Sequence, residues 1–257
     1  KGKNLSTFAT GAQLEESMRF YKMALAEDID YALAYAGLAE TYASRHMLKD
    51  FISSAQPDDP LKALQYAQRA YQLEPNLVEI YQALAMAQTV NGQIKEAQAS
   101  IQKALEMKPG DSQTIVTYLI LKGLQKLSLE ETKKELAALK ADLNDPWIQF
   151  TLGSAYFEQL EGNPTADIHS AIELLESAQK QLPNYVLIPT MLSVGYAIEQ
   201  KPDKAKEMAN QALLLEPDNP IVVFLVSITF MVIDELEQAE QLLLKSIQLS
   251  PKFGYAY

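Results

Sequence analysis

The chain has 257 residues, of which 48% are hydrophobic and 21% charged, a composition typical of a folded protein rather than a disordered one. Its net charge of −11 argues against nucleic acid or an anionic membrane as a partner. The absence of cysteine excludes disulfides and thiolate metal sites, and it leaves the compartment open between the cytoplasm and an exported location.

Prolines end apolar helical runs at a fixed interval along the chain. Pro75 and Pro109 are 34 residues apart, and Pro183, Pro217 and Pro251 follow one another at the same distance. The interval from Pro109 to Pro183 fits two such units, one without its proline, plus six extra residues. A fixed period in this range is typical of solenoids built from repeated helical units.

Each unit repeats the same pattern of small and large residues. A small residue stands five positions before each proline (Ala70, Ala104, Ala178, Ala212, Ser246) and another twelve positions before it (Ala63, Ala97, Ala171, Ala205, Ala239). The first half of a unit carries an apolar–small pair followed by an aromatic residue, as in Leu38–Ala39 and Tyr42. Spacings of three, four and seven place these residues on one helical face. The pattern predicts two antiparallel helices that cross at the small residues, with the second helix ended by proline.

This pattern resembles the tetratricopeptide repeat (TPR) family, whose units are helix pairs of 34 residues. The resemblance covers essentially the whole chain. It implies an all-α fold: a right-handed superhelical solenoid of antiparallel helix pairs, with about 14 helices here. It also implies that the chain binds other proteins along a concave face lined by the first helix of each pair.

The units follow one another in a single array over residues 1–257. We expect about seven, the first and last incomplete, with insertions near 44–59 and 159–165. The unit near Leu143 is degenerate, because Lys122 replaces its aromatic residue and Glu131 a small one, so we expect looser helix packing there. The segment 251–257 begins another unit, which suggests that the natural protein continues or that its ends self-associate.

The segment Lys1–Tyr42 is also similar to the start of TPR arrays in bacterial signalling proteins. There the array follows a catalytic or DNA-binding domain. This resemblance implies a regulatory module of a larger protein, acting through self-association or contacts with its own chain, as an alternative to a partner-binding scaffold.

The first helices of the second half carry an apolar stripe offset from the core. We predict a partner-binding groove there for a helix or an extended peptide, with fewer contacts from the first half. Its residues are Trp147, Phe150, Phe157, Leu187, Met191, Val194, Phe224, Leu225, Ile228 and Met231, with Gln82 and Met86 from the first half. The alternative is that the stripe is core, since the segment Ile221–Ile233 is apolar all round.

Some TPR domains hold a peptide's C-terminal carboxylate with basic and amide side chains. The corresponding places here are Ala36, Glu40 and Ala83, so we expect an apolar ligand instead. The two histidines, His46 and His169, have no second ligand at metal-binding spacing, and no catalytic motif is present. We therefore expect a non-catalytic protein–protein interaction scaffold without metal or cofactor, and without membrane insertion because no apolar run is long enough.

Overall fold

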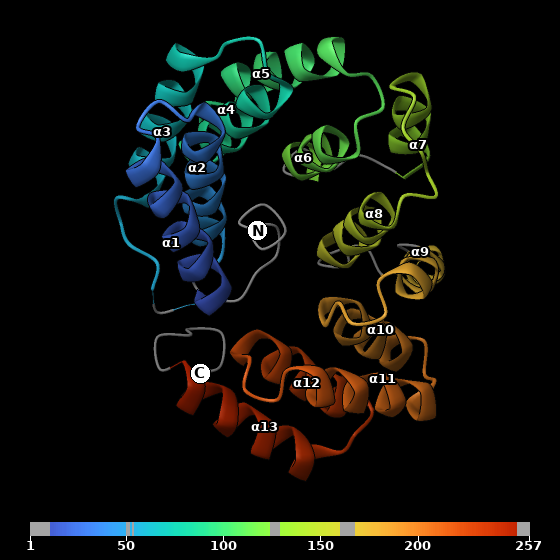
Figure 1. Ribbon diagram of the computed structural model, residues 1–257. Coiled ribbons are helices and arrows are strands. Elements are labelled where there is room, and N and C mark those ends of the chain that lie inside the picture. The colour runs from blue at the N-terminus through green and yellow to red at the C-terminus, as the bar shows by residue number, and fades with distance from the viewer. Residues whose placement is uncertain (1–10, 50–51, 53, 124–128, 160–167, 251–257) are drawn as a thin grey trace. The chain divides into compact units, whose positions relative to one another are not determined.

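The computed structural model describes residues 11–49, 52, 54–123, 129–159 and 168–250. In this part of the chain all regular structure is helical (Figure 1). The helices are α1 Gly11–Glu27, α2 Ala32–Met47, α3 Asp59–Leu73, α4 Val78–Val90, α5 Ile94–Met107, α6 Ser112–Gly123, α7 Leu129–Ala138, α8 Pro146–Gln159, α9 Ile168–Gln181, α10 Leu187–Ile198, α11 Pro202–Leu215, α12 Pro220–Val232 and α13 Leu236–Leu249. The expected all-α fold is confirmed, with thirteen helices within these ranges.

The helices fall into two compact units, unit 1 over residues 1–141 and unit 2 over residues 142–257. The boundary follows the degenerate repeat, in which Leu143 stands where other repeats have proline. This division into two units does not test the prediction that the repeats form a single array over residues 1–257. In unit 2, α8, α10 and α12 lie in one layer and α9, α11 and α13 in the other (Figure 1). We call the even-numbered helices first helices and the others second helices.

The small residues of the pattern lie where helices cross. The alanines twelve and five positions before the prolines of the regular repeats are at most 3% exposed, and Ser246 is fully buried. Aromatic residues fill the wider ends of the helix pairs, since Tyr42 stacks on Tyr66 of α3 with ring centroids 5.5 Å apart. Gly37 on α2 allows the ring of Tyr21 on α1 to approach so closely that a Cβ would lie 2.2 Å from it. The predicted packing is therefore confirmed for the helix pairs of the regular repeats.

Helix ends follow from local chemistry. The second helices of the regular repeats, α3, α5, α9, α11 and α13, stop two residues before proline, because proline disfavours helical conformation in the preceding residue. At the start of α6, Asp111 accepts a hydrogen bond from the backbone amide of Thr114 at 3.0 Å. Burial raises the pKa of Asp111, but hydrogen bonds from Lys108 and Thr114 outweigh it, and the net pKa lies below its usual value.

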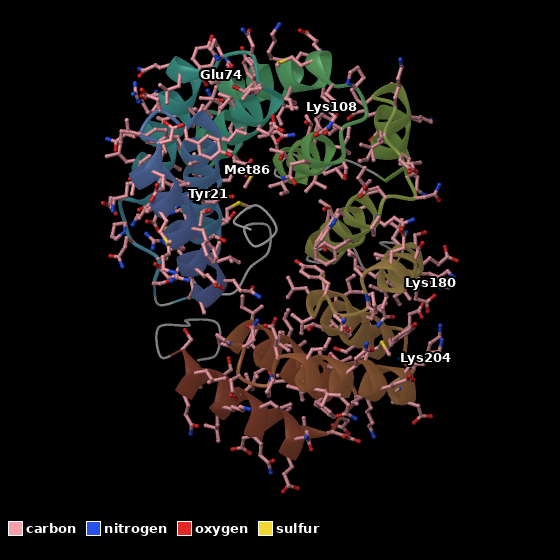
Figure 2. All side chains as sticks on the ribbon, viewed as in Figure 1. Tyr21, Glu74, Met86, Lys108, Lys180 and Lys204 are labelled. Carbon is pink, nitrogen blue, oxygen red and sulfur yellow. The ribbon has the colours of Figure 1, made fainter. Side chains whose placement is uncertain are left out.

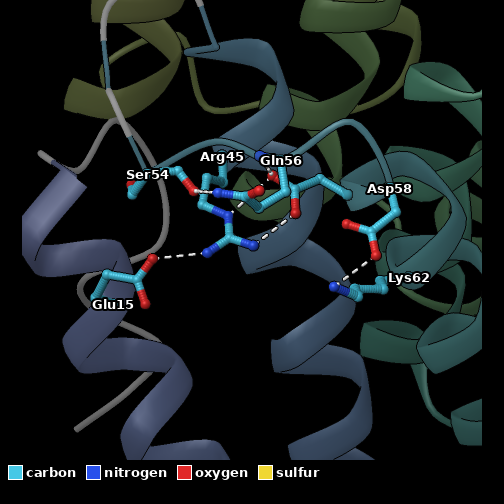
Figure 3. Close-up of polar contacts among 7 residues, drawn as sticks. Glu15, Arg45, Ser54, Gln56, Asp58 and Lys62 are labelled. Atoms are coloured by element: carbon cyan, nitrogen blue, oxygen red, sulfur yellow. Dashed lines mark hydrogen bonds and ion pairs between the residues drawn. The ribbon is translucent and has the colours of Figure 1, made fainter.

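The insertion near 44–59 lengthens α2 and is fixed to its neighbours by an ion network (Figure 3). Arg45 on α2 donates two hydrogen bonds to the fully buried carboxylate of Asp59, from Nε at 2.9 Å and from Nη2 at 2.6 Å. Its Nη1 reaches Glu15 on α1 at 2.6 Å. The same Asp59 carboxylate accepts the backbone amide of Gln56 at 2.8 Å. The network thus joins α1, α2 and the start of α3, which the sequence pattern did not indicate.

The degenerate repeat leaves a cavity of about 300 Å³ between α5, α6 and α7. Ile101, Leu105 and Leu121 form much of its wall, and a polar trio closes another part. In this trio Glu135 accepts a hydrogen bond from Tyr118 and lies 3.4 Å from the Nζ of Lys122. Lys122 stands at the place of the aromatic residue of regular repeats, so the space that this ring would fill stays open. The cavity agrees with the looser packing expected for this repeat.

Candidate functional site: the first-helix face of unit 2

The predicted groove residues of unit 2 form a partly exposed apolar surface on three adjacent first helices. It consists of Trp147 on α8, Leu187, Met191 and Val194 on α10, and Phe224, Leu225, Ile228 and Met231 on α12. We call it the first-helix face. Seven of these side chains are half-buried, and Met231 is 46% exposed. The segment Ile221–Ile233 is therefore not buried all round within the described part of the chain.

Cross-helix contacts place α8, α10 and α12 side by side. The hydroxyl of Ser154 on α8 lies 3.3 Å from the sulfur of Met191 on α10. The hydroxyls of Ser193 on α10 and Thr229 on α12 lie 2.8 Å apart and are buried. The residues of the first-helix face thus belong to one surface rather than to separate patches.

Phe150 is a correction to the predicted groove. Its side chain is only 1% exposed and packs under Tyr185, with ring centroids 5.1 Å apart and the rings nearly perpendicular. Trp147 contacts the same tyrosine edge-on at 5.0 Å and remains half-buried. Tyr185 comes two residues after Pro183 and precedes α10, a place at which the stripe pattern has no member. Phe150 therefore supports Trp147 through Tyr185 and offers no surface to a partner.

The two predicted contacts of unit 1 are also buried. Gln82 on α4 is 1% exposed and donates from Nε2 to Asp111 at 2.7 Å and to Thr114 at 2.8 Å. Its side chain therefore connects α4 to the start of α6 instead of facing a ligand. Met86, labelled in Figure 2, is 9% exposed and belongs to the core cluster of unit 1. The side chain of Phe157 lies outside the described residues.

The places that would hold a peptide carboxylate are closed as well. Ala36 and Ala83 are buried at 3% and 0% exposure, and Glu40 is 8% exposed. Their burial adds to the absence of a basic side chain as an argument against such a ligand.

Charge is distributed unevenly between the units. Sixteen acidic and six basic residues give unit 2 a net charge of −10, whereas seventeen acidic and sixteen basic residues give unit 1 a net charge of −1. No described side chain of α8, α10 or α12 is charged. The described basic residues of unit 2 lie on or next to second helices, as Lys180 on α9 and Lys204 on α11 do in Figure 2. The first-helix face is therefore an uncharged surface on a strongly acidic unit.

The described residues show no arrangement typical of a catalytic or metal centre. No group of three His, Asp or Glu side chains among them could hold a metal ion. The exposed ring of His169, at the start of α9, lies 3.0 Å from Glu199, which directly follows α10. The described helices include none long and apolar enough to cross a membrane.

Comparisons with known proteins identify the fold. No protein-family model and no curated protein matches the sequence. Among solved structures, a chain of the APC/C hetero-tetramer Cut9–Hcn1 matches 95% of this chain with a TM-score of 0.67 and 16% identity, and 46% of its own length is covered. Human IFIT1, solved with the RNA m7Gppp-AAAA, matches 93% of this chain with a TM-score of 0.70 and 20% identity, and 56% of its length is covered.

PilF of Pseudomonas aeruginosa matches 86% of this chain with a TM-score of 0.55 and 16% identity, and 97% of PilF is covered. The chain thus spans about half the length of the Cut9–Hcn1 and IFIT1 chains and nearly all of PilF. Cut9, IFIT1 and PilF are TPR proteins. The helix pairs, their 34-residue period and these likenesses show that the chain has a TPR-like solenoid fold.

Proposed function

We propose that the chain is a non-catalytic scaffold that binds a partner protein through the first-helix face of unit 2. One observation carries this proposal: eight apolar side chains on three adjacent helices are half-buried or exposed, and no described side chain on these helices is charged. Contiguous apolar surface on a folded protein usually marks an interaction site. Met and aromatic residues, which the first-helix face contains, are enriched at interface centres.

The structural relatives are consistent with a scaffold in general. Cut9 was solved as a complex with Hcn1, whereas IFIT1 was solved with RNA. The net charge of −10 on unit 2 favours a protein over a nucleic acid for this chain, because binding to phosphates depends on clustered Lys and Arg.

The test compares three forms of the chain in a pull-down from lysate of the organism that makes it. One is the unmodified chain, one carries Ile228→Gln and Met231→Gln on the first-helix face, and one carries Leu214→Gln. Leu214 on α11 is 84% exposed, so it controls for loss of an exposed apolar side chain on a second helix. Circular dichroism first confirms that all three are equally helical.

A partner bound through the first-helix face is retained by the unmodified chain and by the Leu214 variant and is lost by the double variant. Retention of the same proteins by all three forms overturns the proposal. A mass that rises with concentration and falls in the double variant would instead indicate that the face binds a second copy of the chain, as expected for a self-associating regulatory module.

A further inference from the structure

The described hydroxyl groups of α8, α10 and α12 donate hydrogen bonds within the protein. Ser154 donates its hydroxyl proton to the carbonyl of Phe150 at 2.8 Å. Thr190 donates to the carbonyl of Val186 at 2.7 Å, and Ser227 to that of Phe224 at 2.6 Å. The described side-chain amide on these helices, that of Gln149, is buried and donates to the carbonyl of Leu143.

This arrangement selects the conformation of the partner. An extended peptide laid on a surface brings backbone amides and carbonyls that need new hydrogen-bond partners when they lose water. The described side chains of α8, α10 and α12 offer hydroxyls whose protons are already donated, and no charged or accessible amide group. An α-helix satisfies its own backbone groups and presents only side chains. The surface is therefore suited to a helix and poorly suited to an extended chain.

Charge selects the composition of that helix. Acidic residues stand beside two of the first helices: Asp142 and Asp145 precede α8, and α12 lies between Asp218, which pairs with Lys245 at 3.1 Å, and Asp234. With a net charge of −10 on unit 2, basic residues beside the apolar face of a bound helix gain attraction and acidic residues meet repulsion. Three adjacent helices at the usual packing distance span roughly 20 Å, which a helix of about 13 residues covers.

We propose that the first-helix face of unit 2 receives a cationic amphipathic α-helix, its apolar side on α8, α10 and α12 and its basic residues toward the acidic surroundings. This inference rests on the proposed function and adds the class of partner. Apolar positions at i, i+3, i+4 and i+7 are the expected signature of the bound segment.

Trp147 provides a direct measurement, because it is the only tryptophan in the chain and lies on the first-helix face. Its fluorescence is followed while the full chain is titrated with each of three 18-residue peptides free of tryptophan. The first contains Leu at helical spacing and Lys elsewhere. The second keeps the Leu positions and replaces Lys by Gln. The third has the composition of the first with Leu and Lys in strict alternation, which favours a strand.

The helical Leu/Lys peptide is expected to bind at least tenfold more tightly than either of the others and to gain helical circular dichroism on binding. High salt should reduce its advantage over the Gln peptide, because salt screens exposed charges. The variant with Ile228→Gln and Met231→Gln should weaken binding at least tenfold without changing the charge of the protein. The matched variant Leu214→Gln should leave it unchanged.

The possible failures separate this inference from the proposed function. If the alternating or the Gln peptide binds as tightly as the first, and the double variant abolishes that binding, the face is a binding site but its occupant is not a cationic helix. If the helical peptide binds the double variant as well as the unmodified chain, or if no peptide binds, the inference is overturned, and the pull-down alone decides the proposed function.

Discussion

Replacing Asp59 by Ala should destabilise unit 1 more than a typical single substitution. The Asp59 carboxylate is fully buried and accepts hydrogen bonds from Nε and Nη2 of Arg45 and from the backbone amide of Gln56. The substitution leaves the guanidinium of Arg45, whose side chain is 8% exposed, without its main counter-charge. Breaking a buried ion pair from one side costs about 3 to 5 kcal/mol.

We expect the lower end of that range, about 3 kcal/mol, because Arg45 keeps its contact with Glu15. The side chain of Glu15 is 51% exposed, so water can reach this part of the network. The free energy of unfolding is measured by urea titration, with circular dichroism for the whole chain and Trp147 fluorescence for unit 2. In a chain that already carries Arg45→Met, Asp59→Ala should cost about 2 kcal/mol less, because there is no longer a buried guanidinium that loses its counter-charge.

Asp58→Ala is the matched control, since the neighbouring carboxylate is 52% exposed and pairs with Lys62 at 2.7 Å, one turn along α3. Exposed pairs of this kind contribute little, so stability should hardly change. Equal losses for the Asp58 and Asp59 variants, or a loss below about 1 kcal/mol for Asp59→Ala, would refute the argument that the buried network fixes the insertion to α1 and α3.

Three further predictions follow from individual contacts. The pKa of Asp111 is lower in the folded state than its ordinary value, so its stabilising contribution is present above about pH 4 and is lost as the pH falls through the folded pKa. Asp111→Asn should therefore make the urea midpoint of unfolding depend less steeply on pH below about pH 4. An unchanged slope would contradict this. Gly37→Ala should lower the free energy of unfolding by about 1 to 2 kcal/mol through overpacking against Tyr21, despite the better helix propensity of Ala. Adding Tyr21→Leu should restore most of this loss. If the double variant shows no recovery, the strain does not arise from the contact with Tyr21. Lys122→Tyr supplies the aromatic residue of regular repeats, and Glu135→Ala removes the carboxylate that pairs with Lys122. Together they should raise stability by about 1 kcal/mol by filling the cavity, as thermal unfolding would show. A loss of stability would mean that the polar trio stabilises α6 and α7 more than a filled core does.

The repeat architecture could be predicted from the sequence because its determinants are local and periodic. Pro75 and its counterparts stop helices regardless of what surrounds them, and alanines such as Ala63 and Ala70 mark crossings because only a small side chain permits close approach. The same reasoning identified Lys122 as a departure from the pattern, and a cavity lies beside it.

The candidate site could be predicted only in part. Helical spacing shows which face of α8 or α12 a residue occupies, and Ile228 and Met231 are accessible as expected. Spacing does not show what a neighbouring segment places over that face. Phe150 has the right spacing but is buried, because Tyr185 comes from the turn before α10.

The sequence by itself therefore determined the helix pairs, their ends, their small-residue crossings and the uncharged stripe of unit 2, since each depends on residue type and spacing within one unit. Only the tertiary structure decided that Gln82 joins α4 to α6, that Arg45 pairs with Asp59, and that Phe150 supports the surface from beneath. These contacts join residues 14 to 35 positions apart on different segments. Their register is set by how whole helices pack, and no local pattern records it.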